Sequence, residues 1–113
     1  MAELDLVRPI AAMYQLVLQF AANTISDYDA LVALEQQLTA VLGDNEIDGH
    51  DMGSGQANIF ILTPDPQKAF HQIVPVLEHT GQMPALTAAF RRTDEDRYRV
   101  LWPENSSREF SVA

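Results

Sequence analysis

The sequence predicts an α+β fold, a ferredoxin-like plait of the order β-α-β-β-α-β with one further C-terminal strand. Five short segments have the residue patterns of strands, two longer segments have apolar residues at helical spacing, and the strand pairs have short connections. Because crossovers through a helix are right-handed and connections do not cross one another, this order favours one antiparallel sheet with the first and third strands in the centre. Both helices are expected on one face of the sheet, and the last strand is expected beside the fourth.

The first half of the chain contains the clearest patterns. Residues 14–21 alternate between two sets of side chains, which is typical of a half-buried strand. Residues 27–42 have apolar side chains at helical spacing, so this helix is expected to pack on the sheet. Ser26 and Asp29 have capping-box spacing at its start, and Gly43 stands where a left-handed C-terminal cap is expected.

The middle of the chain predicts a hairpin followed by a second helix. Residues 46–52 are polar enough for an edge strand, whereas residues 57–62 form an almost continuous apolar run, as in a central strand covered on both faces. Asp65 can cap the second helix, and Pro66 suits its first position. Pro75 lies inside this helix, so we expect a kink or a helix in two pieces.

The C-terminal part predicts a second hairpin. Residues 86–92 and 97–102 are short strands around a turn at 93–96. The chain beyond them is polar, and we expect residues 103–113 to be a loosely held tail. Residues 1–12 lead into the first strand, and the 113 residues are expected to form one domain.

Composition and charge exclude several classes of function. The chain has no cysteine, which excludes a disulfide framework, thiolate catalysis and a cysteine-ligated metal site. Its formal net charge of −9 disfavours binding to nucleic acid or to an anionic membrane and is compatible with a basic protein partner. No window approaches the roughly 18 uncharged apolar residues that span a bilayer, and the N-terminus lacks the pattern of a signal peptide. We therefore expect a cytosolic protein, and no cofactor signature is present.

A polar segment in the first predicted hairpin is one candidate ligand-binding site. Alternation places Asp48 and His50 on one strand face, and a three-residue turn would set His50 opposite Asn58, whereas a four-residue turn would shift the register by one. These side chains could hold a small ligand, with the carboxylate orienting the imidazole. Backbone amides of the turn around Ser54 could bind an anion. The alternative is an edge strand with solvated polar groups and an ordinary glycine turn.

The histidines and serines give no catalytic or metal site. His71 and His79 lie eight residues apart on the second predicted helix, which is too far for a pair on adjacent turns, and they suit surface or cap positions. His50 has no second ligand in the sequence and is poor evidence for a metal. Ser26 and Ser54 have no histidine and acid partners in the sequence, so nucleophilic catalysis has no support.

Positive charge is concentrated in the last predicted hairpin. Four of the seven basic residues lie there, namely Arg91, Arg92, Arg97 and Arg99. If Arg92 pairs with Arg97, then Arg92, Arg97 and Arg99 share one face, where like charges are unfavourable unless something neutralises them. The acidic turn at 94–96 could do so. The alternative is an acidic partner, either a ligand carboxylate or phosphate or an acidic patch of a second subunit.

The third predicted strand is apolar on both faces. With both helices on one side, either Ile59 and Ile61 or Phe60 and Leu62 must lie on the open side, near Val17. Contiguous apolar patches usually mark an interface, so we predict a homodimer or another protein partner. The predicted interface residues are Val17, Phe60, Ile61, Arg92, Arg97 and Arg99. The competing explanation is that the C-terminal tail folds over the sheet.

One segment resembles a stretch found in small bacterial proteins of about this length with no assigned function. It reads Asp48-Gly-His-Asp-Met-Gly-Ser-Gly-Gln-Ala-Asn-Ile-Phe-Ile-Leu-Thr-Pro-Asp-Pro66. The resemblance extends over most of the chain, implies a compact bacterial cytosolic protein and transfers no catalytic residues. Acylphosphatases do not fit, because residues 21–24 lack their glycine-rich anion loop and arginine. RNA-recognition domains do not fit, because the polar residues of the central strands are Gln15, Gln19 and Asn58, with little positive charge.

These observations favour a non-enzymatic protein-interaction or regulatory module that acts through the open face of the sheet. An inhibitor that neutralises a basic toxin is one specific form of it. The alternatives are a plait that binds a small molecule near Asp48, His50 and Asn58, or a dimeric enzyme that uses His50 as a general base. The fold itself is common to many activities and supports none of them.

Overall fold

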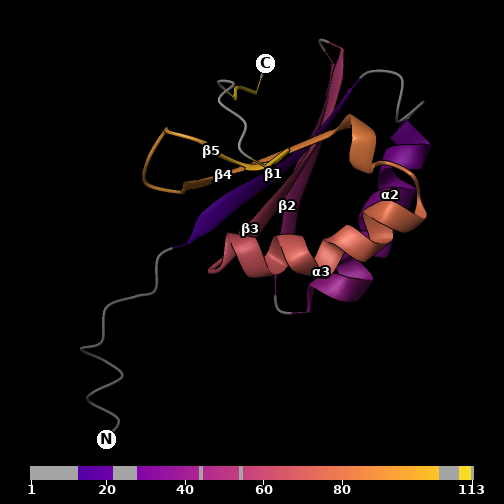
Figure 1. Cartoon of the computed structure of the whole chain (residues 1–113), viewed down its shortest axis with the longest axis horizontal. Coiled ribbons are helices and arrows are strands. Elements are labelled where there is room, and N and C mark those ends of the chain that lie inside the picture. The colour runs from indigo at the N-terminus through magenta and orange to yellow at the C-terminus, as the bar shows by residue number, and fades with distance from the viewer. Residues whose placement is uncertain (1–12, 22–27, 44, 54, 105–109, 113) are drawn as a thin grey trace, which may run out of the picture.

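The computed structural model describes residues 13–21, 28–43, 45–53, 55–104 and 110–112 (Figure 1). Its elements are β1 (Tyr14–Ala21), α2 (Tyr28–Leu42), β2 (Glu46–Gly53), β3 (Gln56–Thr63), α3 (Pro66–His79), the 3₁₀ helix η1 (Met83–Ala85), β4 (Leu86–Arg92) and β5 (Arg99–Trp102). The predicted order of strands and helices is therefore confirmed. The predicted cap at Ser26 lies outside the described residues.

The five strands form one antiparallel sheet in the order β2-β3-β1-β4-β5. β1 lies between β3 and β4, so the prediction that the first and third strands are central is correct. Strands β1 to β4 have the neighbours of a ferredoxin-like sheet, and β5 adds a fifth strand beside β4, so the complete order is not that of the four-stranded fold. Both helices cover one face of the sheet (Figure 1). The predicted α+β plait with an added C-terminal strand is confirmed.

The hydrophobic core lies between this face and the helices. Leu16, Leu18 and Phe20 of β1 point toward the helices and have no exposed area. The register places Ile61 beside Leu16 and Ile59 beside Leu18, on the same face. The prediction that Ile61 is an interface residue is therefore wrong, because alternation along β3 puts it in the core at 0% exposure. The helices complete the core with Leu31, Leu34, Leu38, Leu42, Ala69, Phe70, Ile73 and Leu77.

Helix α3 begins as the sequence predicts. The carboxylate of Asp65 accepts a hydrogen bond from the backbone N–H of Lys68 at 3.1 Å, and Pro66 occupies the first turn, where a missing N–H costs nothing. The helix continues through Pro75 to His79, so the alternative of a helix in two pieces is wrong. Pro75 is exposed, and the buried face of α3 packs on both sides of it. That packing offsets the one hydrogen bond that the proline removes.

The second hairpin is less regular than predicted. β5 begins at Arg99 rather than at residue 97, and the ladder pairs Phe90 with Arg99 and Ala89 with Val100. The predicted pair of Arg92 and Arg97 is not part of this ladder. β4 ends at Arg92 and β5 begins only at Arg99, so Arg97 lies in the connection between the two strands. A β-bulge follows at Ala88 and Ala89. None of the helices in the described part of the chain is long and apolar enough to cross a membrane.

Candidate functional site

The residues predicted to form a polar site do not come together. Gly53 pairs with Gln56, so two positions connect β2 and β3 instead of three, and Asp51 lies opposite Asn58. His50 lies opposite Ile59, on the face that the helices cover. Since a shift of one residue moves a side chain to the other face of a sheet, His50 and Asn58 point to opposite faces. The predicted pairing of His50 with Asn58 is wrong because the two-residue connection is shorter than the turn it assumed.

Asp48, another predicted member of that site, lies in an irregular part of β2. The register of β2 shifts between Ile47 and Gly49, so Asp48 is the extra residue of a β-bulge in an exposed edge strand. A bulge and an exposed carboxylate are common protection against pairing of an edge strand with another chain. Ser54 lies outside the described residues.

His50 instead meets a carboxylate of α2. Its Nδ1 lies 2.8 Å from Oε1 of Glu35, and the two side chains are 27% and 14% exposed. The contact joins the edge strand β2 to the helix that covers it, and it becomes an ion pair when the imidazole is protonated. The contact between His50 and Glu35 could not be predicted from the sequence, because it depends on the register of β2, which directs His50 toward α2.

The face of the sheet away from the helices carries a polar cluster around Gln19. Its Nε2 lies within hydrogen-bonding distance of Oε1 of Gln56 at 3.1 Å, Oδ1 of Asn58 at 3.2 Å and the backbone oxygen of Ser111 at 3.0 Å. An amide nitrogen has two hydrogens for these three acceptors, so one hydrogen is shared. Asn58 is 1% exposed, and this cluster is therefore a structural link between β1, β3 and the C-terminal segment rather than an open site.

The C-terminal segment, residues 110–112, lies against this face of the sheet (Figure 1). Phe110 packs edge-on against Tyr98, with ring centroids 4.9 Å apart. Val17, in the middle of the face, has no exposed area, and Phe60 beside it is half-buried. Val17 is therefore not an exposed interface residue in this conformation. The competing explanation, a tail that folds over the sheet, agrees with these contacts.

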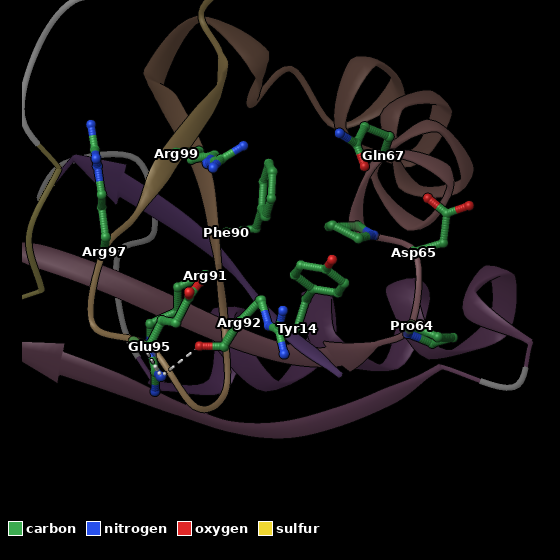
Figure 2. Close-up of a pocket in the computed structure, with 11 residues that line it drawn as sticks. Tyr14, Pro64, Asp65, Gln67, Phe90, Arg91, Arg92, Glu95, Arg97 and Arg99 are labelled. Atoms are coloured by element: carbon green, nitrogen blue, oxygen red, sulfur yellow. Dashed lines mark hydrogen bonds between the residues drawn. The ribbon is translucent and has the colours of Figure 1, made fainter. Parts of the chain in front are cut away.

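A cleft of about 430 Å³ lies at one end of the sheet, between the β4–β5 hairpin and the start of α3 (Figure 2). Tyr14 pairs with Thr63 of β3 and with Arg92 of β4, so the start of β1 and the ends of both neighbouring strands lie side by side. The chain after β3 enters α3 at this point, and the chain after β4 forms the turn of the hairpin. The lining residues are Tyr14, Pro64, Asp65, Pro66, Gln67, Phe90, Arg91, Arg92, Glu95, Arg97 and Arg99.

Two of the four arginines in this cleft have partners of their own. Arg91 donates from Nε to Oε1 of Gln15 at 3.2 Å, and its Nη1 donates to the backbone oxygens of residues 92, 93 and 95. It therefore closes the turn of the hairpin. Arg92 forms two parallel hydrogen bonds with the carboxylate of Asp94, each 3.1 Å long. These bonds and the charge of Asp94 hold the pKa of Arg92 above its ordinary value.

Arg97 and Arg99 are different. Within the described residues, neither side chain forms a hydrogen bond or an ion pair, and both are exposed. Figure 2 shows Arg99 reaching from β5 toward the first turn of α3, whereas Arg97 lies at the margin of the cleft. The predicted neutralisation by the acidic turn thus applies to Arg92, and the described acidic residues leave Arg97 and Arg99 without a partner.

The cleft also contains two carboxylates, those of Asp65 and Glu95. Asp65 is occupied, because it caps α3 through the N–H of Lys68. Arg92 is neutralised by Asp94, and Arg91 is directed toward Gln15 on the other face of the sheet. The positive charge of the lining that has no partner among the described residues is therefore that of Arg97 and Arg99, in a chain whose formal charge is −9. The lining can therefore attract a carboxylate or phosphate that the rest of the surface repels.

The sequence predicts one wall of this cleft and not the other. It placed Arg92, Arg97 and Arg99 together, and all three do line the cleft. It did not connect them with Pro64–Gln67, although the plait topology contains that signal. Because β1 is antiparallel to both β3 and β4, the end of the third strand must lie near the end of the fourth.

Among the described residues, no group of three or more histidine, aspartate or glutamate side chains is arranged to hold a metal ion. Comparisons of the chain with protein-family models, with curated proteins and with solved structures gave no match.

Proposed function

We propose that this protein is a non-enzymatic interaction module that binds an acidic partner in the arginine cleft. The observation that carries the proposal is the pair Arg97 and Arg99, which line a cleft of about 430 Å³ without a partner among the described residues. Guanidinium groups bind carboxylates and phosphates through paired hydrogen bonds, which gives geometric specificity as well as attraction. Arg99 at the start of β5 and Arg97 just before it, next to the start of a helix, are a suitable receptor for such a group.

The charge of the whole chain supports selective binding. A net charge of −9 repels acidic partners from most of the surface, so attraction is restricted to the place where the arginines gather. Complementary charge of this kind raises the rate of association and excludes wrong partners more than it raises affinity. We therefore expect a salt-sensitive, reversible interaction.

The cleft is a better candidate than the open face of the sheet. The contacts of Phe110 and Ser111 place the C-terminal segment on that face, which reduces the apolar area available to a partner. The predicted homodimer stays a prediction, and an acidic surface of a second copy is one form that the acidic partner can take. A polar site around His50 has no support, because His50 and Asn58 point to opposite faces of the sheet.

The proposal is tested by titration with capped hexaglutamate, followed by NMR chemical shifts or calorimetry at low and at physiological ionic strength. We expect Arg97→Ala and Arg99→Ala each to weaken binding several-fold, and the double variant about tenfold or more. Lys68→Ala is the matched control, since Lys68 is an exposed cation on α3 that does not line the cleft. Equal losses in Arg99→Ala and Lys68→Ala would show that only net charge matters and would overturn the proposal.

A further inference from the structure

We infer that the arginine cleft is one end of a longer groove between α3 and β5, and that this groove binds an extended peptide with an acidic end, an apolar middle and a basic end. The inference rests on the proposed function and specifies its partner. It is carried by a second hollow, which adjoins the cleft and has the opposite charge.

The second hollow has a volume of about 350 Å³ and mostly apolar walls. Phe70 and Val74 of α3 form one wall, and Leu101 and Trp102 of β5 form the other. The indole N–H of Trp102 donates to the backbone oxygen of Met83 at 3.4 Å, and both residues line the hollow. Apolar side chains of a partner can replace water here, and the aromatic ring offers a large contact surface.

Acidic groups stand at the far end of this hollow. Glu78 and Glu104 line it, both are exposed, and neither forms an ion pair within the described part of the chain. The lining contains no lysine or arginine, and His71 is its one titratable nitrogen group. Glu78 also lies in the last turn of α3, where the helix dipole disfavours a negative charge. A basic side chain of a partner would pair with these carboxylates and would offset the unfavourable interaction of Glu78 with the helix dipole.

The two hollows meet at Gln67, which lines both. Along α3, the cationic hollow lies at Gln67 and the acidic end lies at Glu78. β5 runs in the same sense, from Arg99 at the cationic end to Trp102 in the apolar part. The groove therefore changes in one direction from positive to apolar to negative.

The length of the groove gives the size of its occupant. Gln67 and Glu78 are separated by eleven residues of helix, which at a rise of 1.5 Å per residue is about 16 Å. An extended chain covers about 3.3 Å per residue, so about five residues span this distance. Both charged ends of a short acidic–apolar–basic peptide can thus reach their partners together.

The test uses the full chain and three capped peptides. The bipolar peptide is Glu-Glu-Leu-Phe-Leu-Lys-Lys, its uncharged analogue has glutamine at the four charged positions, and hexaglutamate reports on the arginine cleft alone. Trp102 is the only tryptophan of the chain, and the peptides contain none, so its fluorescence reports occupation of the apolar part. The variants are Glu78→Gln with Glu104→Gln, and Arg97→Ala with Arg99→Ala.

We expect the bipolar peptide to bind at least tenfold more tightly than the other two and to change the fluorescence of Trp102, which hexaglutamate leaves unchanged. The glutamine variant should weaken the bipolar peptide about fivefold and leave hexaglutamate within about twofold. The alanine variant should weaken both charged peptides.

Two failures are distinguishable. If hexaglutamate requires the arginines but the bipolar peptide gains nothing from Glu78 and Glu104, the extended groove is refuted and the arginine cleft stands. If the loss of Arg97 and Arg99 leaves both peptides unaffected, the proposed function is refuted as well. Folding of each variant is checked by circular dichroism, and neither pair of residues is buried.

Discussion

The cluster around Gln19 allows a test in which one chemical change has opposite effects at two positions of the same strand. Gln19 and Gln15 both point to the face away from the helices, four residues apart on β1. Gln19 acts as a donor, since its Nε2 serves three oxygen acceptors. Gln15 acts as an acceptor, since its Oε1 receives hydrogen bonds from Nε of Arg91 and from the hydroxyl of Tyr98, each 3.2 Å long.

Replacement of glutamine by glutamate removes the donor and keeps the acceptor. At Gln19, the change places a negative oxygen among three oxygens and leaves the buried Oδ1 of Asn58 without its donor. A net hydrogen bond contributes about 0.5–1.5 kcal/mol, and a buried acceptor left unpaired costs about 1–3 kcal/mol. We therefore expect Gln19→Glu to lower the free energy of unfolding by about 2–3 kcal/mol.

At Gln15, the same substitution keeps both hydrogen bonds and makes them charge-assisted, which roughly doubles their strength. Gln15→Glu should therefore leave the free energy of unfolding unchanged or raise it by about 0.5 kcal/mol, because Arg91 is only partly buried and solvent screens the gain.

The assay is urea unfolding followed by circular dichroism. With a slope of about 1–3 kcal/mol per molar urea, the loss at Gln19 lowers the midpoint by about 0.7–3 M. The three neighbouring oxygens raise the pKa of the carboxyl introduced at position 19 above its ordinary value of about 4.3. As the pH falls, this carboxyl becomes protonated and can donate again, so the difference between the two variants should shrink. Equal midpoints at neutral pH, or a Gln15→Glu variant as unstable as Gln19→Glu, would refute the assignment of donor and acceptor roles.

Three further changes test other parts of the structure. Ile61→Ala should cost about 2–5 kcal/mol in urea unfolding because Ile61 lies in the core, whereas Phe60→Ala on the half-buried face should cost clearly less; the reverse order would contradict the register of β3. A double-mutant cycle of His50→Ala and Glu35→Ala should give a coupling of about 0.5–1 kcal/mol, and additive losses would show that the 2.8 Å contact is not formed in solution. Deletion of residues 110–113 should uncover the sheet face and cause the chain to self-associate, which light scattering would detect as an increase in mass. If the truncated chain has the same oligomeric state as the full-length chain, the segment does not have a covering role.

The fold was predictable from the sequence to a large extent, because its main signals are local. The alternation in residues 14–21 and the cap at Asp65 each determine an element without knowledge of the rest of the chain. The connection around Gly53 was not predictable in the same way. Gly53 is compatible with both a turn and an extended strand, and the difference of one residue decides which face His50 occupies.

The candidate site shows the same limit at longer range. The positions of the arginines along the chain placed them in the last hairpin, and they do line one cleft. Their partners and neighbours depend on which strand ends meet, which follows from the sheet order rather than from any local pattern. The contact between Phe110 and Tyr98 is of this kind too, since no periodic pattern connects a polar tail with a sheet face.

The proposed groove depends on an element that is added to the ferredoxin-like arrangement, which agrees with the rule that this fold alone gives little information about function. The four strands of the ferredoxin-like arrangement, β1 to β4, and the buried faces of the two helices are occupied with packing. β5 is the element added to that arrangement, and it supplies Arg99 to one hollow and Leu101 and Trp102 to the other. Without β5, one wall of each hollow would be missing, and the side of α3 that carries Phe70 and Val74 would have no facing wall. The addition of β5 therefore converts a helix of the common plait into one side of a groove, and binding specificity is expected to follow the sequence of this last hairpin.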